Sequence, residues 1–345
     1  MMDEIFNISD CSGKPVYKQL VGSIEKAIRS ETLQAGLQLP SLNSLARQLD
    51  ISKETVKKTY GILTDRGLIE PRQGKGYFVA NHTDSSDSRI LLLFDKLSSY
   101  KQLLFDAFTN TMGDKAKIAI RIYNQDPSLL KFYLDESLDT FDYYVLSPHF
   151  PLDASSQNMA IKQIKRIPYR KLIMVDNWMR AVPGNYGAVY QDFENDIASG
   201  LASALDKIKT YPRLNVFTLP SSLYSKIIAK GIERFGKENG IKIRFIDEIK
   251  PEMIKVNEVF LSINSQFDAA LIDLIRTARN NHLEIGRDIG LISFNEDPTS
   301  EIILNGLTTV STDFVEMGRL TANMILDGKM SKVHCPFRMT RRSSF

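Results

Sequence analysis

The chain has few of the residues that build disulfide-rich or metal-dependent proteins, since its 345 residues include only two cysteines. Cys11 and Cys335 stand near opposite ends, without the ligand spacing of a metal site, which argues against a disulfide framework and against bound zinc. No apolar run reaches the roughly eighteen residues that a membrane span needs, and the first residues lack the basic and apolar regions of a signal peptide. We therefore expect a cytoplasmic protein with no membrane partner and no metal.

Signatures of common enzyme classes are missing as well. The chain contains no complete Gly-x-x-x-x-Gly-Lys-Ser/Thr phosphate loop, no Gly-x-Ser-x-Gly nucleophile elbow and no His-Glu-x-x-His zinc helix. We therefore expect no catalytic residues and no cofactor. The net charge of +3 is small, so any contact with nucleic acid must come from a local patch. Hydrophobic residues make up 43% of the chain, which is enough for several packed cores at this length.

Two short helices joined by a tight turn are predicted between Gly36 and Arg66. Apolar residues recur there at the spacing of one helical face, twice in succession: Leu42, Leu45, Ala46 and Leu49, then Val56, Tyr60 and Leu63. Ser41 and Ser52 stand at the N-cap positions, and Gly67 ends the second helix. The opposite face of the second helix keeps charged residues. This is typical of a helix that enters the major groove of DNA, although such a face is often merely solvated.

A small hairpin follows the second helix. Residues 68–70 and 77–79 are typical of two strands, and Gly74 and Gly76 allow a tight turn and a close approach at its tip. Helix, turn, helix and hairpin together predict a winged helix-turn-helix DNA-binding domain over residues 1–80. The residues that we expect to contact DNA are Ser41, Asn43, Ser52, Lys53, Glu54, Thr55, Lys57, Lys58, Arg72, Lys75 and Gly76.

This segment resembles the DNA-binding domain of GntR-type bacterial regulators. The motifs that carry the resemblance are Leu39-Pro40-Ser41, Gly67-Leu68-Ile69 and the wing Gly74-x-Gly76-x-Phe78-Val79. The resemblance implies a transcription regulator whose partner is operator DNA. Two such heads on a two-fold axis multiply specificity, so we expect a homodimer on a roughly palindromic operator. Asn43, Lys53 and Lys57 stand where the family usually carries arginine, and lysine lacks the bidentate fork that arginine offers guanine.

The chain beyond this domain has a different pattern. A polar run over 81–88 contains no apolar anchor and is predicted to be a linker. From residue 89 to 345, helical stretches alternate with short strand-like runs: 90–94, 118–123, 143–146, 172–175, 216–219, 243–246, 259–263 and 289–294. Such alternation predicts an α/β fold of parallel sheets covered by helices, whose ligands bind outside the carboxyl ends of the strands. The pattern alone allows either one large doubly wound sheet or two smaller lobes.

Several stretches resemble the effector domain of the lac repressor family, a relative of periplasmic sugar-binding proteins: residues 189–192, 290–296, 307–310 and 317–319. The resemblance implies two lobes, three chain crossings between them, and a small effector, usually a sugar, in the cleft. Carboxylates and aromatic rings at strand ends suit sugar hydroxyls and sugar faces. The ligand-binding residues that we expect are Ser98, Tyr100, His149, Asp176, Trp178, Asp192, Tyr224, Gln266 and Asn295, and Asp95 and Ser147 lie in the same predicted loops.

Each of these residues also has a plainer interpretation. Asp192 precedes a helix and could serve only as its N-cap, His149 could be an ordinary loop residue, and Trp178 could cover the edge of a lobe. The alternative function is a DNA-binding head fused to an enzyme domain that acts on a sugar or a related metabolite. An aminotransferase-like domain with pyridoxal phosphate would need a longer chain and a recognisable Schiff-base lysine segment, which we do not find.

Overall fold

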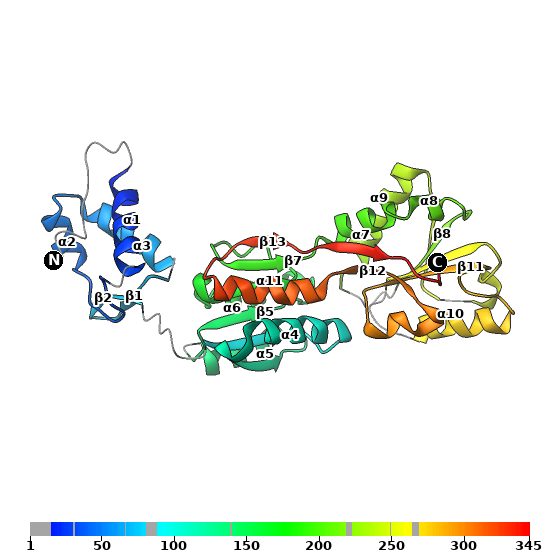
Figure 1. Cartoon of the computed structure of the whole chain (residues 1–345), viewed down its shortest axis with the longest axis horizontal. Coiled ribbons are helices and arrows are strands. Elements are labelled where there is room, and N and C mark those ends of the chain that lie inside the picture. The colour runs from blue at the N-terminus through cyan, green and yellow to red at the C-terminus, as the bar shows by residue number, and fades with distance from the viewer. Residues whose placement is uncertain are drawn as a thin grey trace. The chain divides into compact units, whose positions relative to one another are not determined.

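The computed structural model describes residues 15–29, 32–65, 67–80, 88–138, 140–218, 223–248, 250–263 and 269–345. The chain divides into two compact units, 1–87 and 88–345 (Figure 1). The predicted linker lies outside the described residues except for Ser88, which already begins the first strand of the second unit.

The first unit has a helix-turn-helix with a wing. Its helices are α1 (Val16–Arg29), α2 (Leu42–Gln48) and α3 (Lys53–Asp65), and its antiparallel hairpin is β1 (Ile69–Arg72) with β2 (Gly76–Val79). The apolar stripes predicted for α2 and α3 meet α1 in one core that includes Leu20, Leu45, Val56, Tyr60 and Leu63. The predicted winged helix-turn-helix is therefore confirmed.

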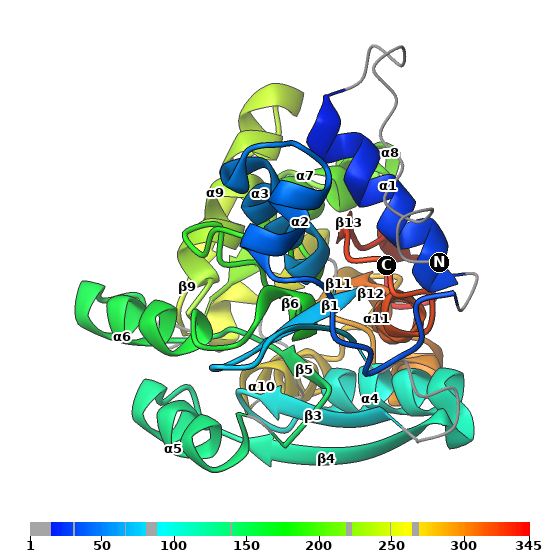
Figure 2. The same cartoon turned by 90° about the vertical axis from the view of Figure 1, so that its left-hand side faces the viewer.

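The second unit contains two lobes, each built on a six-stranded sheet. In the first lobe the strand order is β13-β7-β6-β5-β3-β4 and all pairs are parallel. The strands are β3 (Ser88–Phe94), β4 (Ala116–Ile122), β5 (Tyr143–Leu146), β6 (Leu172–Asp176), β7 (Gly187–Tyr190) and β13 (Lys332–His334). Helices α4 (Ser99–Met112) and α11 (Phe314–Leu326) cover one face of this sheet, while α5 (Pro127–Ser137) and α6 (Ala154–Ile164) cover the other (Figure 2).

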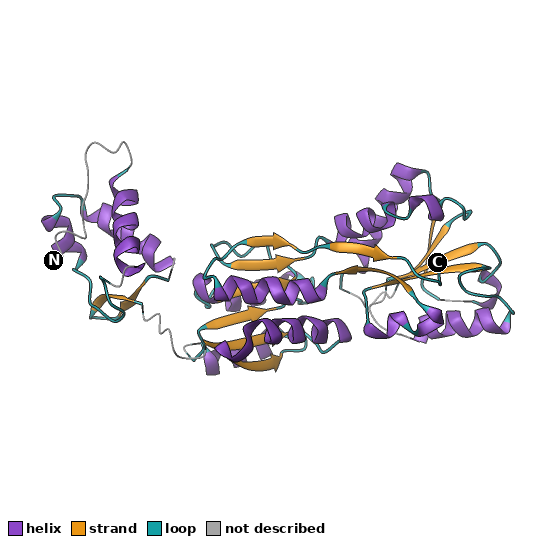
Figure 3. Ribbon diagram, viewed as in Figure 1, coloured by secondary structure: helices purple, strands orange, loops and turns teal. Residues whose placement is uncertain are grey.

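The second lobe has the strand order β14-β12-β11-β10-β8-β9, in which only β14 is antiparallel to its neighbour. The strands are β8 (Leu214–Phe217), β9 (Ile243–Ile246), β10 (Glu258–Ser262), β11 (Ile289–Phe294), β12 (Thr308–Thr312) and β14 (Phe337–Thr340). Its helices are α7 (Phe193–Ala202), α8 (Leu205–Ile208), α9 (Ser225–Asn239) and α10 (Ala269–Asn280), and helices flank the strands in both lobes (Figure 3). Short 3₁₀ turns lie at Gly113–Lys115, Tyr169–Lys171, Pro251–Met253, Pro298–Glu301 and Ile303–Asn305.

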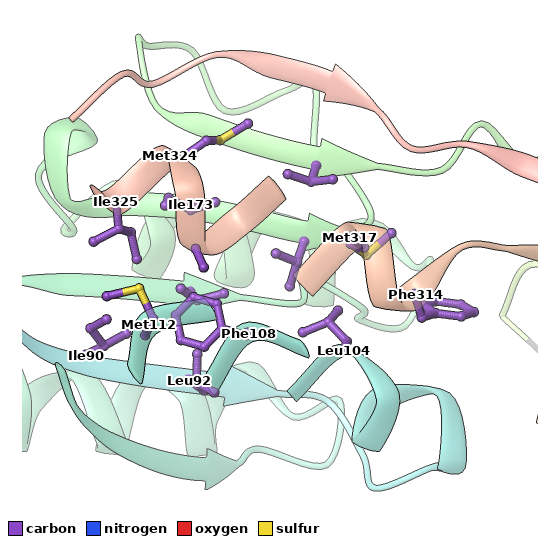
Figure 4. Packing of buried hydrophobic residues seen from close by; sticks show 14 of the residues in the cluster. Ile90, Leu92, Leu104, Phe108, Met112, Ile173, Phe314, Met317, Met324 and Ile325 are labelled. Atoms are coloured by element: carbon purple, nitrogen blue, oxygen red, sulfur yellow. The ribbon is translucent and has the colours of Figure 1, made fainter. Parts of the chain in front are cut away.

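The chain passes between the two sheets three times: from β7 to β8, from β12 to α11, and from β13 to β14. Two lobes with three crossings are therefore confirmed, and a single large sheet is excluded. Helix α11 returns to the first lobe by packing on α4, where Leu104, Phe108 and Met317 share one core (Figure 4). Gly318 permits this approach, because a Cβ there would lie 2.3 Å from the Leu104 carbonyl oxygen.

Within the ranges given above, none of the helices is both long and apolar enough to cross a bilayer. The same ranges hold no gathering of three or more His, Cys, Asp or Glu side chains suited to a metal ion.

Candidate functional sites

The exposed face of α3 carries the lysines predicted to contact DNA. Lys53, Glu54 and Lys57 are exposed, and the Lys57 ammonium lies 3.9 Å from a Glu54 carboxylate oxygen in a loose pair whose side chains are 64% and 80% exposed. Lys58 differs from its neighbours, because its ammonium lies 3.9 Å from the centre of the Tyr17 ring on α1. Lys53 and Lys57 therefore have more freedom than Lys58 to reach a ligand.

The predicted caps are present at both helix starts. Ser41 Oγ accepts a hydrogen bond from the Ser44 amide at 3.1 Å, and Ser52 Oγ accepts one from the Thr55 amide at 3.1 Å. Ser52 Oγ also lies 2.8 Å from the Thr55 hydroxyl, while Asn43 is exposed on α2. The two serines fix where α2 and α3 begin, which positions the exposed residues of both helices.

The wing is tied to the body of the first unit. Gln38 Nε2 donates to the Lys75 carbonyl oxygen at 2.7 Å, and the Arg72 guanidinium pairs with Glu70 at 2.9 Å while lying over the Phe78 ring. Lys75 and Arg72 remain exposed at the tip. A fixed, positively charged tip is suited to a phosphate backbone or a groove.

Replacing Gly76 with valine should weaken DNA binding roughly tenfold or more without unfolding the first unit. Gly76 has a φ of 99°, a conformation that costs a β-branched residue roughly 1–3 kcal/mol. A Cβ there meets only Gln38 Nε2 at 3.5 Å, so the wing tip should distort while the core stays packed. Mobility-shift titration together with thermal melting measures both effects.

Gly74→Asn is the matched control, because the φ of Gly74 is 71°, which asparagine tolerates, and a Cβ there meets nothing within 4 Å. Normal DNA binding by a folded Gly76→Val protein would show that the hairpin points away from the duplex.

In the second unit, a buried cluster lies at the carboxyl ends of β3, β5 and β6. We call it the Lys101 cluster; its members are Asp95, Lys101, Ser147, His149 and Asp176. Lys101, on α4, is 1% exposed. Its Nζ lies 3.0 Å from Asp95 Oδ1 and 2.7 Å from Asp176 Oδ2, and it also donates to Ser147 Oγ. An ammonium has three N–H bonds, so all of its donors are used.

The charges in this cluster stabilise one another. Burial alone would lower the pKa of Lys101, but the Asp176 and Asp95 carboxylates outweigh burial and hold that pKa above its ordinary value. Burial would likewise raise the pKa values of Asp176 and Asp95, but the Lys101 ammonium, with His149, holds both below their ordinary value. At neutral pH the cluster therefore contains two carboxylates and one ammonium.

His149 joins the cluster to the second lobe. Its Nε2 lies 2.8 Å from Asp176 Oδ2 and its Nδ1 lies 2.8 Å from the Tyr224 hydroxyl, just before α9. Because an ionised carboxylate only accepts, Nε2 carries the proton, and in a neutral ring Nδ1 accepts from Tyr224. Asn177 Nδ2 donates to the same hydroxyl at 3.0 Å.

Gln191 makes a second connection between the lobes. Its amide nitrogen donates to Asp176 Oδ1, and its Oε1 accepts from the Thr312 hydroxyl at 2.6 Å. Gln191 follows β7 in the first sheet and Thr312 ends β12 in the second. The carboxyl ends of both sheets therefore face one another here, which is the place where parallel α/β sheets bind ligands.

In the described part of the second lobe, two buried polar side-chain atoms have no hydrogen-bond partner. Ser262 ends β10 and Asn295 follows β11, and they are 3% and 9% exposed. Among the described residues, neither Ser262 Oγ nor Asn295 Oδ1 has a hydrogen-bond partner. Leaving such an atom unsatisfied costs about 1–3 kcal/mol, so both atoms can gain from a ligand that hydrogen-bonds.

The structure brings only some of the predicted ligand-binding residues together. His149, Asp176 and Tyr224 are bonded in one network. Ser98 caps α4 by accepting from the Lys101 amide at 3.3 Å, and Tyr100 packs on Phe314, where burial raises its pKa to about 12. Gln266 lies outside the described residues.

Trp178 and Asp192 are engaged in local contacts. The Trp178 indole donates to the Tyr186 hydroxyl at 2.9 Å and its ring lies 5.0 Å from that of Tyr190. Asp192 is the N-cap of α7, and its carboxylate accepts from both the amide and the side chain of Asn195. Within the described part of the chain, neither side chain hydrogen-bonds to the Lys101 cluster, and a ligand role for Trp178 and Asp192 remains a prediction.

Lys101, Gln191 and Thr312 were not among the residues expected to form the site. A signal for Lys101 does exist in the sequence: it stands three residues before Leu104 and seven before Phe108, on the buried face of α4. A lysine on an apolar helical stripe requires a buried carboxylate partner.

Comparison with known proteins places the two units in known families. Residues 16–79 match the model of bacterial regulatory proteins of the gntR family, and residues 247–344 match that of the periplasmic binding protein-like domain. The HTH-type transcriptional regulator YhcF of Bacillus subtilis is 32% identical over 87 residues, which span 25% of this chain and 69% of YhcF. The chain belongs to the gntR family. It is thus a transcription regulator with a DNA-binding head.

Solved structures resemble the second unit of this gntR-family protein. One is the lac repressor dimer bound to operator and the anti-inducer ONPF, with a TM-score of 0.58 and 14% identity over 76% of this chain and 95% of that one. Another is a LacI family regulator from Enterococcus faecalis with bound ribose, with a TM-score of 0.56 and 18% identity over 74% of this chain and 98% of that one. At these identities the likeness shows the fold: a periplasmic-binding-protein-like unit.

Proposed function

We propose that residues 1–80 of this regulator bind operator DNA and that residues 89–345 bind a small effector, a monosaccharide, between the two lobes. The DNA contacts are those predicted on α2, α3 and the wing. Acting on chromosomal DNA implies a cytoplasmic protein. The solved relatives support the effector, since one of them holds ribose in the same fold.

The observation that carries the effector proposal is the pair of unsatisfied atoms, Ser262 Oγ and Asn295 Oδ1, at the carboxyl ends of adjacent strands. They belong to the lobe that meets the Lys101 cluster, because Tyr224 bonds to His149 and Thr312 bonds to Gln191, which donates to Asp176. Sugar hydroxyls both donate and accept, so one sugar can satisfy such atoms on one side and the carboxylates on the other. Binding of the sugar would then favour one arrangement of the two lobes over another.

The Lys101 cluster also resembles catalytic groupings, because a serine meets a lysine and a histidine meets a carboxylate. A lysine that activates a serine must lose its proton near neutral pH, which requires a lowered pKa. The pKa of Lys101 is raised instead, so Lys101 stays an ammonium and cannot serve as the base for Ser147. We therefore propose a binding site rather than an active site.

We further propose a homodimer. One winged head contacts few base pairs, whereas two heads related by a two-fold axis fix half-site spacing and multiply specificity. The lac repressor relative supports this arrangement, being a dimer on its operator. An effector that changes the dimer's arrangement changes operator affinity.

Mobility-shift assays on the DNA upstream of its own gene test the proposal, with and without pentoses and hexoses. We expect sequence-specific binding at physiological salt and at least one sugar that changes the affinity. The same sugar at a hundred times its Kd should stabilise the protein by about 2.7 kcal/mol. Binding without sequence preference, or turnover of a sugar, would contradict the proposal.

A further inference from the structure

Lys101 has no hydrogen-bond donor left for an effector. Its three N–H bonds are directed to Asp95, Asp176 and Ser147, and its side chain is almost fully buried. Within the described ranges it is the only lysine or arginine bonded to the cluster. In the second lobe, Arg342 lies beside Leu307 at the start of β12 and pairs with Glu296 at 2.7 Å.

The charges of the cluster do not cancel. Asp95 and Asp176 contribute −2 and Lys101 contributes +1, which leaves −1 when His149 is neutral. Among the residues that the structure describes, the hydrogen-bond partner of Asp95 Oδ2 is Gln125 Nε2 at a long 3.4 Å, so this carboxylate oxygen can still accept from a ligand. Charges interact strongly where water is excluded, so the excess carboxylate repels an anion placed nearby.

We infer that Lys101 sets the charge selectivity of the effector site: it half-neutralises two carboxylates without offering a donor, and the site therefore takes an uncharged, hydroxyl-bearing effector and rejects phosphorylated or carboxylated ones. Ile228, buried in the core at the start of α9, adds no cation from the second lobe. This inference rests on the proposed effector function and names its ligand class.

The test compares neutral sugars with their own anionic forms: D-ribose with D-ribose 5-phosphate, and D-glucose with D-glucose 6-phosphate and D-glucuronate. Dissociation constants come from thermal-melting titrations of the full chain. Any neutral sugar that binds should bind at least about a hundredfold more tightly than its anionic partners, which corresponds to about 2.8 kcal/mol.

Asp95→Asn keeps the shape of the site and brings the charge of the cluster from −1 to zero. In this variant Asp176 and Ser147 still bind the Lys101 ammonium. The melting temperature without ligand shows whether the variant is folded. The preference for neutral over anionic sugars should shrink by about tenfold or more. Asp135→Asn is the control, since it removes the same charge from an exposed carboxylate on α5 that pairs with Lys131 and Arg166, and the preference should not change.

An anionic sugar that binds the wild type as tightly as its neutral form would overturn the inference, as would an Asp95→Asn variant with the wild-type preference. A protein that no sugar of either kind stabilises would instead contradict the sugar effector itself, and this inference with it.

Discussion

Replacing Lys101 with methionine is expected to lower the free energy of unfolding of the 88–345 unit by about 3–5 kcal/mol. Methionine matches the length of the buried stem but removes the ammonium, which leaves Asp95 and Asp176 as uncompensated buried carboxylates. It also removes a hydrogen bond to Ser147. Urea or thermal unfolding measures the change.

The same variant should respond to pH in the opposite sense from the wild type. In the wild type the pKa values of Asp95 and Asp176 are lowered, so the stability they contribute is present above their unfolded pKa and is lost as pH falls through the folded values. Without the ammonium, burial raises the pKa values of Asp95 and Asp176. Protonation as pH falls then removes the buried negative charges and stabilises the variant. The stability difference should therefore narrow as pH falls from about 7 toward 4.

Lys131→Met on α5 is the control, because Lys131 forms an exposed pair with Asp135 and its loss should change stability by about 0.5 kcal/mol or less. A Lys101→Met protein that is as stable as the control, or a stability difference that does not vary with pH, would show that the cluster is not held by charge.

The double substitution Lys53→Ala, Lys57→Ala is expected to weaken operator binding by roughly tenfold to a hundredfold at physiological salt while leaving sugar binding unchanged. Both side chains are exposed on α3, and Lys57 forms a loose pair with Glu54 at 3.9 Å. If both contact phosphates, the loss should be similar for all DNA sequences. The slope of log K against log salt should then fall by about two units.

Lys58→Ala removes the same charge from the same helix, but Lys58 lies over the Tyr17 ring, so we expect a smaller loss of affinity than for either Lys53→Ala or Lys57→Ala. Fluorescence anisotropy at several salt concentrations measures the DNA affinity of the three single variants separately. Equal affinity of the double variant and the wild type would contradict the assignment of this face of α3 to DNA.

The sequence by itself determined the DNA-binding head and the α/β class of the remainder. The head follows from local features: Ser41 and Ser52 cap their helices within three residues, and the wing turns at two glycines, Gly74 and Gly76. Strands can be predicted from local sequence in the same way, because a buried parallel strand is a short apolar run regardless of which strand pairs with it. Signals of this kind need no knowledge of distant residues.

Only the tertiary structure decided how the effector site is built. Lys101 meets Ser147 and Asp176, which are 46 and 75 residues away in the chain, and His149 meets Tyr224 across the two lobes at a separation of 75 residues. Such contacts depend on strand order, which the alternation of strands and helices leaves open. Asp192 differs, because its bonds to Asn195 are the local N-cap contacts that its place before a helix already allowed. Residue type and position near a strand end predict a candidate, but the direction of a side chain is set by the elements that pack against it.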